Sequence, residues 1–245
     1  MAELEIVKHI KKLVALMKDG HSSFWHKLKD FALEIFIIVV AVSISIWFHN
    51  WSDHLNEQKV TRTFLLGLRD DIRTDVTDAK DVLETYHEFD LLYTWISKLD
   101  ASRVPDKDSL HLALTNLTTN TYLRPHRSRF DGFLSAGKIM TIEDDSLTQN
   151  ILTYYQETLP RLKSSEDHWI NENDLLNVYL IDNTKDLESD ISKFQVLTTP
   201  KGRYLAKKLI PWQQLLDRYQ AVILQGNTII SAITSNYGDS PTIKK

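Results

Sequence analysis

Hydrophobic side chains are concentrated in residues 31–48, which read FALEIFIIVVAVSISIWF. These eighteen residues contain one charged side chain, Glu34, near the first end. A helix of this length spans about 27 Å, close to the roughly 30 Å hydrocarbon core of a bilayer. Aromatic residues flank both ends, as membrane interfaces favour. The pattern therefore predicts a transmembrane helix over residues 31–48.

Two other interpretations of this stretch are open. One is the buried core helix of a soluble protein, although uncharged runs of this length are rare in such helices. The other is a cleaved signal peptide, for which the thirty preceding residues are long and Trp47 stands where small residues are preferred. Glu34 is either a carboxylate near the membrane interface or a polar contact to a partner helix.

Beyond the apolar stretch, hydrophobic residues recur every three or four positions, and no proline occurs before Pro105. This spacing places them on one face of a helix. The pattern predicts that the membrane helix continues into a long helix ending near Leu99. The stripe consists of Leu65, Leu68, Ile72, Val76, Ala79, Leu83, Tyr86, Phe89, Tyr93 and Ile96.

Capping residues predict two short helices in the middle of the chain. Asp106 or Asp108 is a candidate N-cap for the first, because an aspartate side chain accepts hydrogen bonds from the first helical turn. The second is expected over residues 128–136 and is closed by Gly137, since glycine readily adopts the left-handed conformation that ends many helices. Residues 118–125 are expected to form a loop between them.

Two longer helices are predicted in the second half. One begins near Asp144 and continues towards Tyr179, with Pro160 expected to kink or split it, because proline lacks an N–H. A shorter helix is expected over residues 199–209. The last helix follows Pro211, and its apolar residues recur at intervals of four and three. They are Trp212, Leu216, Tyr219, Ile223, Gly226, Ile230 and Ile233, widened by Leu215, Val222 and Ile229.

These elements predict an all-α protein, in which an N-terminal transmembrane helix continues into an extracytoplasmic antiparallel helical bundle. We expect a cytoplasmic basic amphipathic segment over residues 1–30, the transmembrane helix over 31–48, the bundle over 49–237 and a flexible tail over 238–245. In the first segment the apolar residues share one helical face and most lysines lie elsewhere. Such a helix suits a membrane surface or a partner protein.

The charge distribution predicts the orientation of the chain. Residues 1–30 contain six lysines against four acidic residues, and Lys27 and Lys29 adjoin the apolar stretch. The residues after it contain 23 basic and 28 acidic side chains, beginning with Lys59 among the basic ones. Positive charge favours the cytoplasmic side. We therefore expect a bacterial inner-membrane protein with a cytoplasmic N-terminus and a periplasmic C-terminal domain.

Candidate binding residues are few. Arg124, Arg127 and Arg129 form a basic cluster before an expected helix start, a position that suits an anion. A solvated or salt-bridged loop is the alternative. The acidic character of the C-terminal domain argues against nucleic acid as a partner. Membrane lipid, and a protein partner or a second copy of the chain, are the expected contacts.

Two patterns on the long helix concern metal binding. Glu84 and His87 share one helical face, but a di-iron bundle needs that pair twice and two further glutamates. The second pattern is a band of aspartates, which we interpret as a solvated face because calcium loops require glycine-bearing turns. The band consists of Asp70, Asp71, Asp75 and Asp78.

Catalytic motifs are not found in the chain. It contains no cysteine, which excludes disulfides and thiolate metal sites and fits a bacterial periplasm. It has no phosphate-binding loop, metalloprotease motif or nucleophile elbow. We therefore expect no catalytic residues, no cofactor and no metal.

Residues 33–51 and 133–139 carry a resemblance to a known family. In the first stretch, Glu34 precedes an apolar run that ends in Asn50 and Trp51; the second contains a Ser-x-Gly turn and is followed by Leu147 and the pair Tyr154 and Tyr155. This combination resembles a family of uncharacterised bacterial single-span membrane proteins, defined as a domain of unknown function.

The match departs from the family pattern of Gly-Glu, an apolar run and Asn-Asn-Trp at two positions. Leu33 replaces the glycine, and His49 replaces the first asparagine. The resemblance implies a membrane-anchored helical protein and supplies no known catalysis.

Together these observations predict a non-enzymatic single-pass membrane protein whose helical bundle binds a protein partner or assembles with itself. The alternative is a periplasmic ligand-sensing bundle that signals through a separate partner, with the cluster from Arg124 to Arg129 as its anion site. An exposed apolar groove would favour the first hypothesis. Convergence of the three arginines on one pocket would favour the second.

Overall fold

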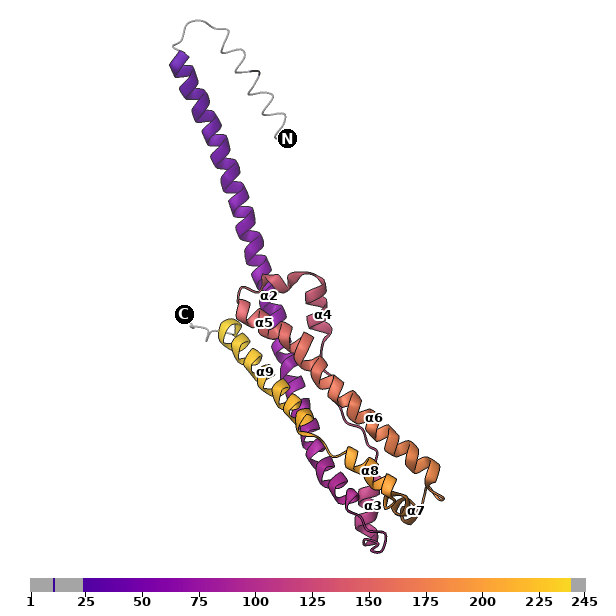
Figure 1. Cartoon of the computed structure of the whole chain (residues 1–245). Coiled ribbons are helices and arrows are strands. Elements are labelled where there is room, and N and C mark those ends of the chain that lie inside the picture. The colour runs from indigo at the N-terminus through magenta and orange to yellow at the C-terminus, as the bar shows by residue number, and fades with distance from the viewer. Residues whose placement is uncertain (1–10, 12–23, 239–245) are drawn as a thin grey trace. The chain divides into compact units, whose positions relative to one another are not determined.

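The structure is a computed structural model that describes Lys11 and residues 24–238 of the 245-residue chain (Figure 1). Within these residues all regular secondary structure is helical, as predicted. Most of the predicted basic segment, residues 1–30, lies outside the described residues. The same holds for all but the first residue of the predicted tail, residues 238–245.

Helix α2 runs without interruption from Phe24 to Ser97. The prediction of one continuous helix that ends near Leu99 is therefore confirmed. The chain divides into two compact units, Met1–Glu57 and Gln58–Lys245, and α2 contributes residues to both. In the second unit the predicted apolar stripe is buried, apart from Leu83, which is partly buried.

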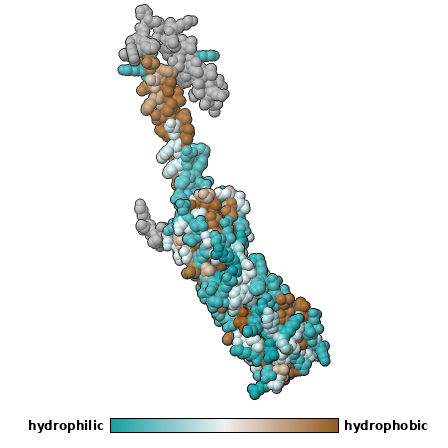
Figure 2. All heavy atoms as spheres, viewed as in Figure 1, coloured by the Kyte–Doolittle hydropathy of each residue, from teal (hydrophilic) through white to brown (hydrophobic). Residues whose placement is uncertain are grey.

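The N-terminal part of α2 is long and apolar enough to cross a membrane, and none of its most apolar 18-residue window is buried. From Leu33 to Phe48 its large hydrophobic side chains are exposed to between 37% at Val40 and 65% at Phe36. Figure 2 shows them as a brown segment of the helix. The core helix of a soluble protein would instead bury such side chains.

Helix α3 (Lys107–Thr115) confirms the first short helix. The side chain of Asp106 is its N-cap and accepts a hydrogen bond from the backbone N–H of Ser109 at 2.9 Å. Residues 116–127 follow and lead to the next helix without regular structure; this segment is called the connection. The loop that the sequence predicts over residues 118–125 lies within the connection.

Helix α4 (Ser128–Ser135) confirms the second short helix. Gly137 follows it with a φ of 68°, in the left-handed region. This is the conformation expected of a glycine that closes a helix. A short 3₁₀ helix, η1 (Lys138–Thr141), comes next.

The predicted long helix around Pro160 is interrupted by a change of helix type. Helix α5 (Asp145–Thr153) passes into a π-helical turn, η2 (Tyr154–Thr158), and then into α6 (Leu159–Asn183). Pro160 has no N–H to donate to the carbonyl of Gln156, as an α-helix would require. A wider turn immediately before the proline accommodates this missing bond without ending the helical path.

Three helices complete the chain: α7 (Asp190–Leu197), α8 (Pro200–Lys208) and α9 (Gln213–Tyr237). Pro211 lies before the first residue of α9 rather than in its first turn. The buried face of α9 is also rotated from the predicted stripe, because the residues expected to widen that stripe form its centre. The fully buried positions are Leu215, Tyr219, Val222, Gly226, Ile229 and Ile233.

Helices α2, α6 and α9 share the core of the second unit, and Figure 1 shows them beside one another there. Phe89 of α2 stacks on Trp169 of α6 with ring centroids 5.1 Å apart. Tyr86 contacts Tyr219 of α9 at 5.5 Å. The indole N–H of Trp169 donates a hydrogen bond to the carbonyl of Leu209 at 3.1 Å, so the buried ring leaves no polar atom unpaired.

Candidate functional site

The three arginines of the predicted anion site have separate partners. The guanidinium group of Arg124 donates a hydrogen bond to the hydroxyl of Tyr122 and lies over the ring of the same tyrosine. Arg127 donates a hydrogen bond to the backbone carbonyl of Tyr155 at 3.2 Å. Arg129 pairs with the carboxylate of an aspartate on α2, Asp71, at 2.9 Å. These contacts do not direct the three guanidinium groups to a common partner, and anion binding by them stays a prediction.

The other candidate residues from the sequence lie on α2. Glu34 is exposed within the apolar part of the helix. Glu84 and His87 are also exposed, in the second unit. Among the residues that the structure describes, no group of three or more histidine, aspartate and glutamate side chains is arranged to hold a metal ion.

The interpretation of the aspartate band as a solvated face is wrong for Asp75, which is fully buried. Its Oδ1 atom accepts a hydrogen bond from the backbone N–H of His126 at 2.9 Å and lies 2.7 Å from ring atom Nδ1. Burial raises the pKa of the Asp75 carboxyl, and the hydrogen bonds from His126 oppose that rise. The same side-chain hydrogen bond raises the pKa of His126.

A second buried carboxylate, Glu166 of α6, holds the connection from the other side. Its Oε1 atom accepts a hydrogen bond from the backbone N–H of Leu123 at 2.8 Å and another from the hydroxyl of Tyr219. The hydroxyl of Tyr86 donates to the carbonyl of Thr121 at 3.1 Å. Burial raises the pKa of the Glu166 carboxyl, which these donors partly counteract. The connection is thus fixed by polar groups that only the folded core supplies.

Thr118 in the connection has a φ of 68°. A β-branched residue rarely adopts this left-handed conformation, which costs on the order of 1–2 kcal/mol. The buried amide of Asn173 holds the next two residues: it donates to the Asn120 side chain at 2.7 Å and to the Thr119 carbonyl at 3.4 Å. Strained backbone of this kind is concentrated at binding sites and switches.

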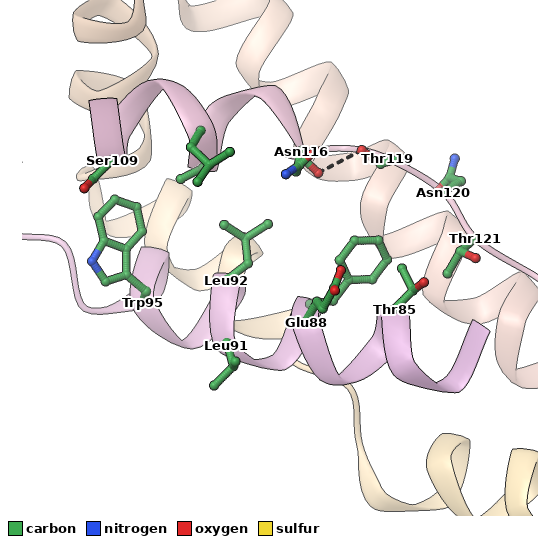
Figure 3. A pocket seen from close by; sticks show the side chains of 13 residues that line it. Thr85, Glu88, Leu91, Leu92, Trp95, Ser109, Asn116, Thr119, Asn120 and Thr121 are labelled. Atoms are coloured by element: carbon green, nitrogen blue, oxygen red, sulfur yellow. Dashed lines mark hydrogen bonds between the residues drawn. The ribbon is translucent and has the colours of Figure 1, made fainter. Parts of the chain in front are cut away.

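A cleft of about 590 Å³ lies beside this strained turn, between α2, α3 and the connection (Figure 3). In Figure 3 the side chains of Leu92 and Trp95 extend from α2 towards α3, and Asn120 and Thr121 of the connection flank the far end. Its size lies within the range of ligand-binding clefts, about 300–1,000 Å³. The lining residues are Thr85, Glu88, Phe89, Leu91, Leu92, Trp95, Ser109, Leu112, Ala113, Asn116, Thr119, Asn120 and Thr121.

Comparison of the chain with protein-family models finds no match. Comparisons with curated proteins and with solved structures find no match either.

The cleft combines exposed hydrophobic surface with one ionisable side chain. Leu112 is 67% exposed and Trp95 is 37% exposed. Amides and hydroxyls surround them, which is the usual arrangement of an apolar centre within a polar rim at an interface. Glu88 is the only charged lining residue. No hydrogen bond or ion pair joins its carboxylate to another described residue.

None of the cleft residues was predicted as a site from the sequence. A usable signal was present, because Leu91, Leu92 and Trp95 lie beside the periodic stripe of α2 rather than on it. Leu112 likewise lies off the buried face of α3, which is formed by Leu110 and Leu114. Apolar residues outside a core-facing stripe mark surface that another molecule covers in many proteins.

Proposed function

We propose that this chain is a non-enzymatic single-pass membrane protein of the bacterial inner membrane, whose helical bundle binds a protein partner. In this proposal residues 31–48 span the membrane, the N-terminus is cytoplasmic and the bundle is periplasmic. The resemblance of the chain to bacterial single-span proteins fits this arrangement. The observation that carries the binding function is the partly apolar cleft between α2, α3 and the connection.

The proposed membrane span is supported by the exposure of its side chains. An exposed, continuous run from Leu33 to Phe48 would be expensive to leave in water, at about 25 cal/mol for each Å² of apolar surface. Lipid removes that cost, and a helix satisfies every backbone hydrogen bond within itself. Lys27 and Lys29 before the span favour a cytoplasmic N-terminus.

The order of side-chain contacts supports a bundle in which α9 is antiparallel to α2. Tyr219 contacts Tyr86, whereas Gly226, seven residues later, lies against Val76, which precedes Tyr86 by ten residues. Helix α6 runs in the same direction as α2, because the connection returns the chain along the bundle before α4. The cleft lies beside this bundle, between α2, α3 and the connection.

Partner binding is supported by the chemistry of the cleft. Tryptophan is one of the residues that most often dominate binding energy at protein interfaces, and in the cleft Trp95 lies among leucines that add apolar contact area. The described residues offer no metal-binding group and no nucleophile paired with a base in the cleft. A binding role therefore fits the cleft better than catalysis.

Membrane insertion is tested by replacing Val39 and Val40 with lysine. Each charge costs about 2.5–3.5 kcal/mol at the centre of a span. The wild-type chain should stay in the membrane pellet after alkaline extraction, and the variant should not. Val60→Lys, an exposed valine on the same helix outside the apolar run, is the matched control. Release of the wild-type chain by alkali would contradict the proposed span.

Partner binding is tested by photocrosslinking from Leu112, followed by capture from detergent-solubilised membranes and mass spectrometry. A protein crosslinked at Leu112 but not at Leu224, which is also exposed and lies on α9, would support the proposal. A chain of monomeric mass with no crosslinked protein would overturn it. A crosslink to a second copy would show self-assembly instead.

A further inference from the structure

We infer that the occupant of the cleft is a basic amphipathic helix of the partner protein, held by Glu88 and by the apolar wall around Trp95. This inference rests on the proposed function and adds the chemistry of the partner. It follows from three features of the cleft: its single charge, its apolar wall and its polar rim.

The negative charge of Glu88 favours a positively charged partner. Glu88 is exposed at the lip, and neither an arginine nor a lysine is among the lining residues. Figure 3 shows its side chain on the cleft side of α2, between Leu92 and Thr85. A carboxylate without a protein partner, next to apolar surface, attracts a lysine or arginine and repels an acidic segment.

The apolar wall of the cleft favours a partner helix with a hydrophobic face. Leu92 and Trp95 are three residues apart and therefore extend along the same side of α2. Leu112 and Ala113 come from the facing helix, α3. Two helices with apolar side chains between them form the kind of groove in which a third helix buries its own apolar stripe.

The polar rim suits a helix better than a lipid chain. Four residues of the connection line the cleft, and their amide and hydroxyl groups offer hydrogen bonds to polar side chains: Asn116, Thr119, Asn120 and Thr121. An acyl chain offers no hydrogen bonds to these groups and would displace water from them, which costs binding energy. A helix with one apolar face and one basic face pairs with both parts of the cleft.

The inference is tested with the full-length chain in a non-ionic detergent, by fluorescence anisotropy of two labelled peptides. Both peptides are designed amphipathic helices of leucine and alanine; one has lysines on its polar face and the other has glutamates. We expect the lysine peptide to bind at least about tenfold more tightly, the effect of a close charge pair in a partly desolvated site. Equal affinities would overturn the inference.

Substitutions in the cleft test whether the preference for the lysine peptide arises there. Glu88→Lys should reverse the peptide preference, and Leu112→Asp should weaken both peptides by about thirtyfold or more, as loss of a central interface contact does. Glu84→Lys, on the same helix but outside the cleft lining, should keep the lysine preference. Circular dichroism melts establish that each variant is folded. Unchanged peptide binding by Leu112→Asp would place the site elsewhere and contradict the inference.

The crosslinking and peptide experiments distinguish failure of the inferred partner chemistry from failure of the proposed binding function. A protein crosslinked at Leu112 that carries an acidic or uncharged binding segment would contradict the inferred chemistry and leave the binding function standing. Failure of the crosslinking experiment to find any protein would remove the proposed function itself. Binding of a dansyl-labelled fatty acid at Leu112, in place of either peptide, would replace the helix with a lipid and overturn the inference.

Discussion

The carboxylate of Asp75 on α2 lies 2.7 Å from the ring Nδ1 of His126, and it also accepts the backbone N–H of the same histidine at 2.9 Å. Asp75 is fully buried, whereas the His126 side chain is 51% exposed. A second oxygen of Asp75, Oδ2, has no hydrogen-bond partner. The contact with His126 is therefore the main compensation for burying this carboxylate.

This contact predicts that stability falls as the pH rises. The hydrogen bond to Asp75 raises the pKa of His126 in the folded chain. The stabilisation is thus complete below the unfolded value of about 6.5 and is lost as the pH rises through the higher folded value. Asp71 and Asp78 face the same imidazole and act in the same direction. Burial raises the pKa of Asp75 as well, so its ionisation also costs stability at higher pH.

The measurement is urea unfolding of the full-length chain at several pH values. His126→Gln keeps the backbone donor but has no titratable ring, so it should lose this part of the pH dependence. It should also cost about 1 kcal/mol at acidic pH, a modest value because the imidazole is half exposed. An identical pH profile for the wild type and the variant would contradict the prediction.

Glu166 predicts a contrast between two substitutions. Glu166→Ala removes the acceptor of Leu123 and Tyr219 and leaves a cavity, so we expect a loss of about 3–4 kcal/mol. Glu166→Gln keeps a carbonyl acceptor without burying a charge, so the loss should stay below about 1.5 kcal/mol. Because burial raises the pKa of Glu166 above 4.5, the wild type has a loss of stability as the pH rises through the folded value of Glu166, and both variants lack this contribution.

Limited proteolysis adds a readout of the connection. Glu166→Ala should expose residues 116–127 to cleavage under conditions in which the glutamine variant and the wild type resist it. Equal destabilisation by alanine and glutamine would show that the hydrogen bonds to Glu166 contribute little.

Alanine substitutions at two glycines are expected to change the stability of the fold in opposite directions. A Cβ at Gly226 would lie 2.5 Å from Cγ2 of Val76 and 3.2 Å from Cγ2 of Ile72, so Gly226→Ala forces α2 and α9 apart. Such overpacking costs about 1–3 kcal/mol. A Cβ at Gly132 on α4 has no neighbour within 4 Å, so Gly132→Ala should gain about 0.5–1 kcal/mol. Thermal melts measure both, and destabilisation by Gly132→Ala would contradict the packing described.

Thr118 predicts a stabilising substitution at the edge of the cleft. Glycine adopts a φ of 68° without the clash that threonine suffers, so Thr118→Gly should gain about 0.5–1 kcal/mol after the cost of its freer unfolded chain. Thr119→Gly, which lacks that strain to relieve, should be destabilising. Denaturant midpoints compare the two variants. A loss of stability in Thr118→Gly equal to that in Thr119→Gly would show that the turn stores no strain.

Local patterns in the sequence were enough to predict most of the helices. The long helix, the Asp106 cap and the Gly137 end depend on residues within about one turn of each other. The stripe of α2 was predicted for the same reason, since a helix face repeats every three or four residues. Pro160 was expected to kink or split its helix, whereas the structure has a π turn before it within a continuous helical path.

The positions of the two buried carboxylates were decided by tertiary structure. Asp75 stands in a band of aspartates and is buried only because His126, 51 residues later, returns to meet it. Glu166 is likewise 43 residues from the Leu123 amide that it holds. No local rule brings such distant groups together, because their contact depends on how the connection crosses the core.

The sequence by itself determined a chain of helices with one continuous apolar stretch at residues 31–48, since length, periodicity and caps are local properties. Only the tertiary structure decided which face of α9 is buried, where each arginine of the cluster finds its partner, and that α2, α3 and the connection enclose a cleft. A cleft forms where the surfaces of neighbouring elements do not pack against each other. Its existence therefore depends on the packing of the whole unit rather than on any single segment.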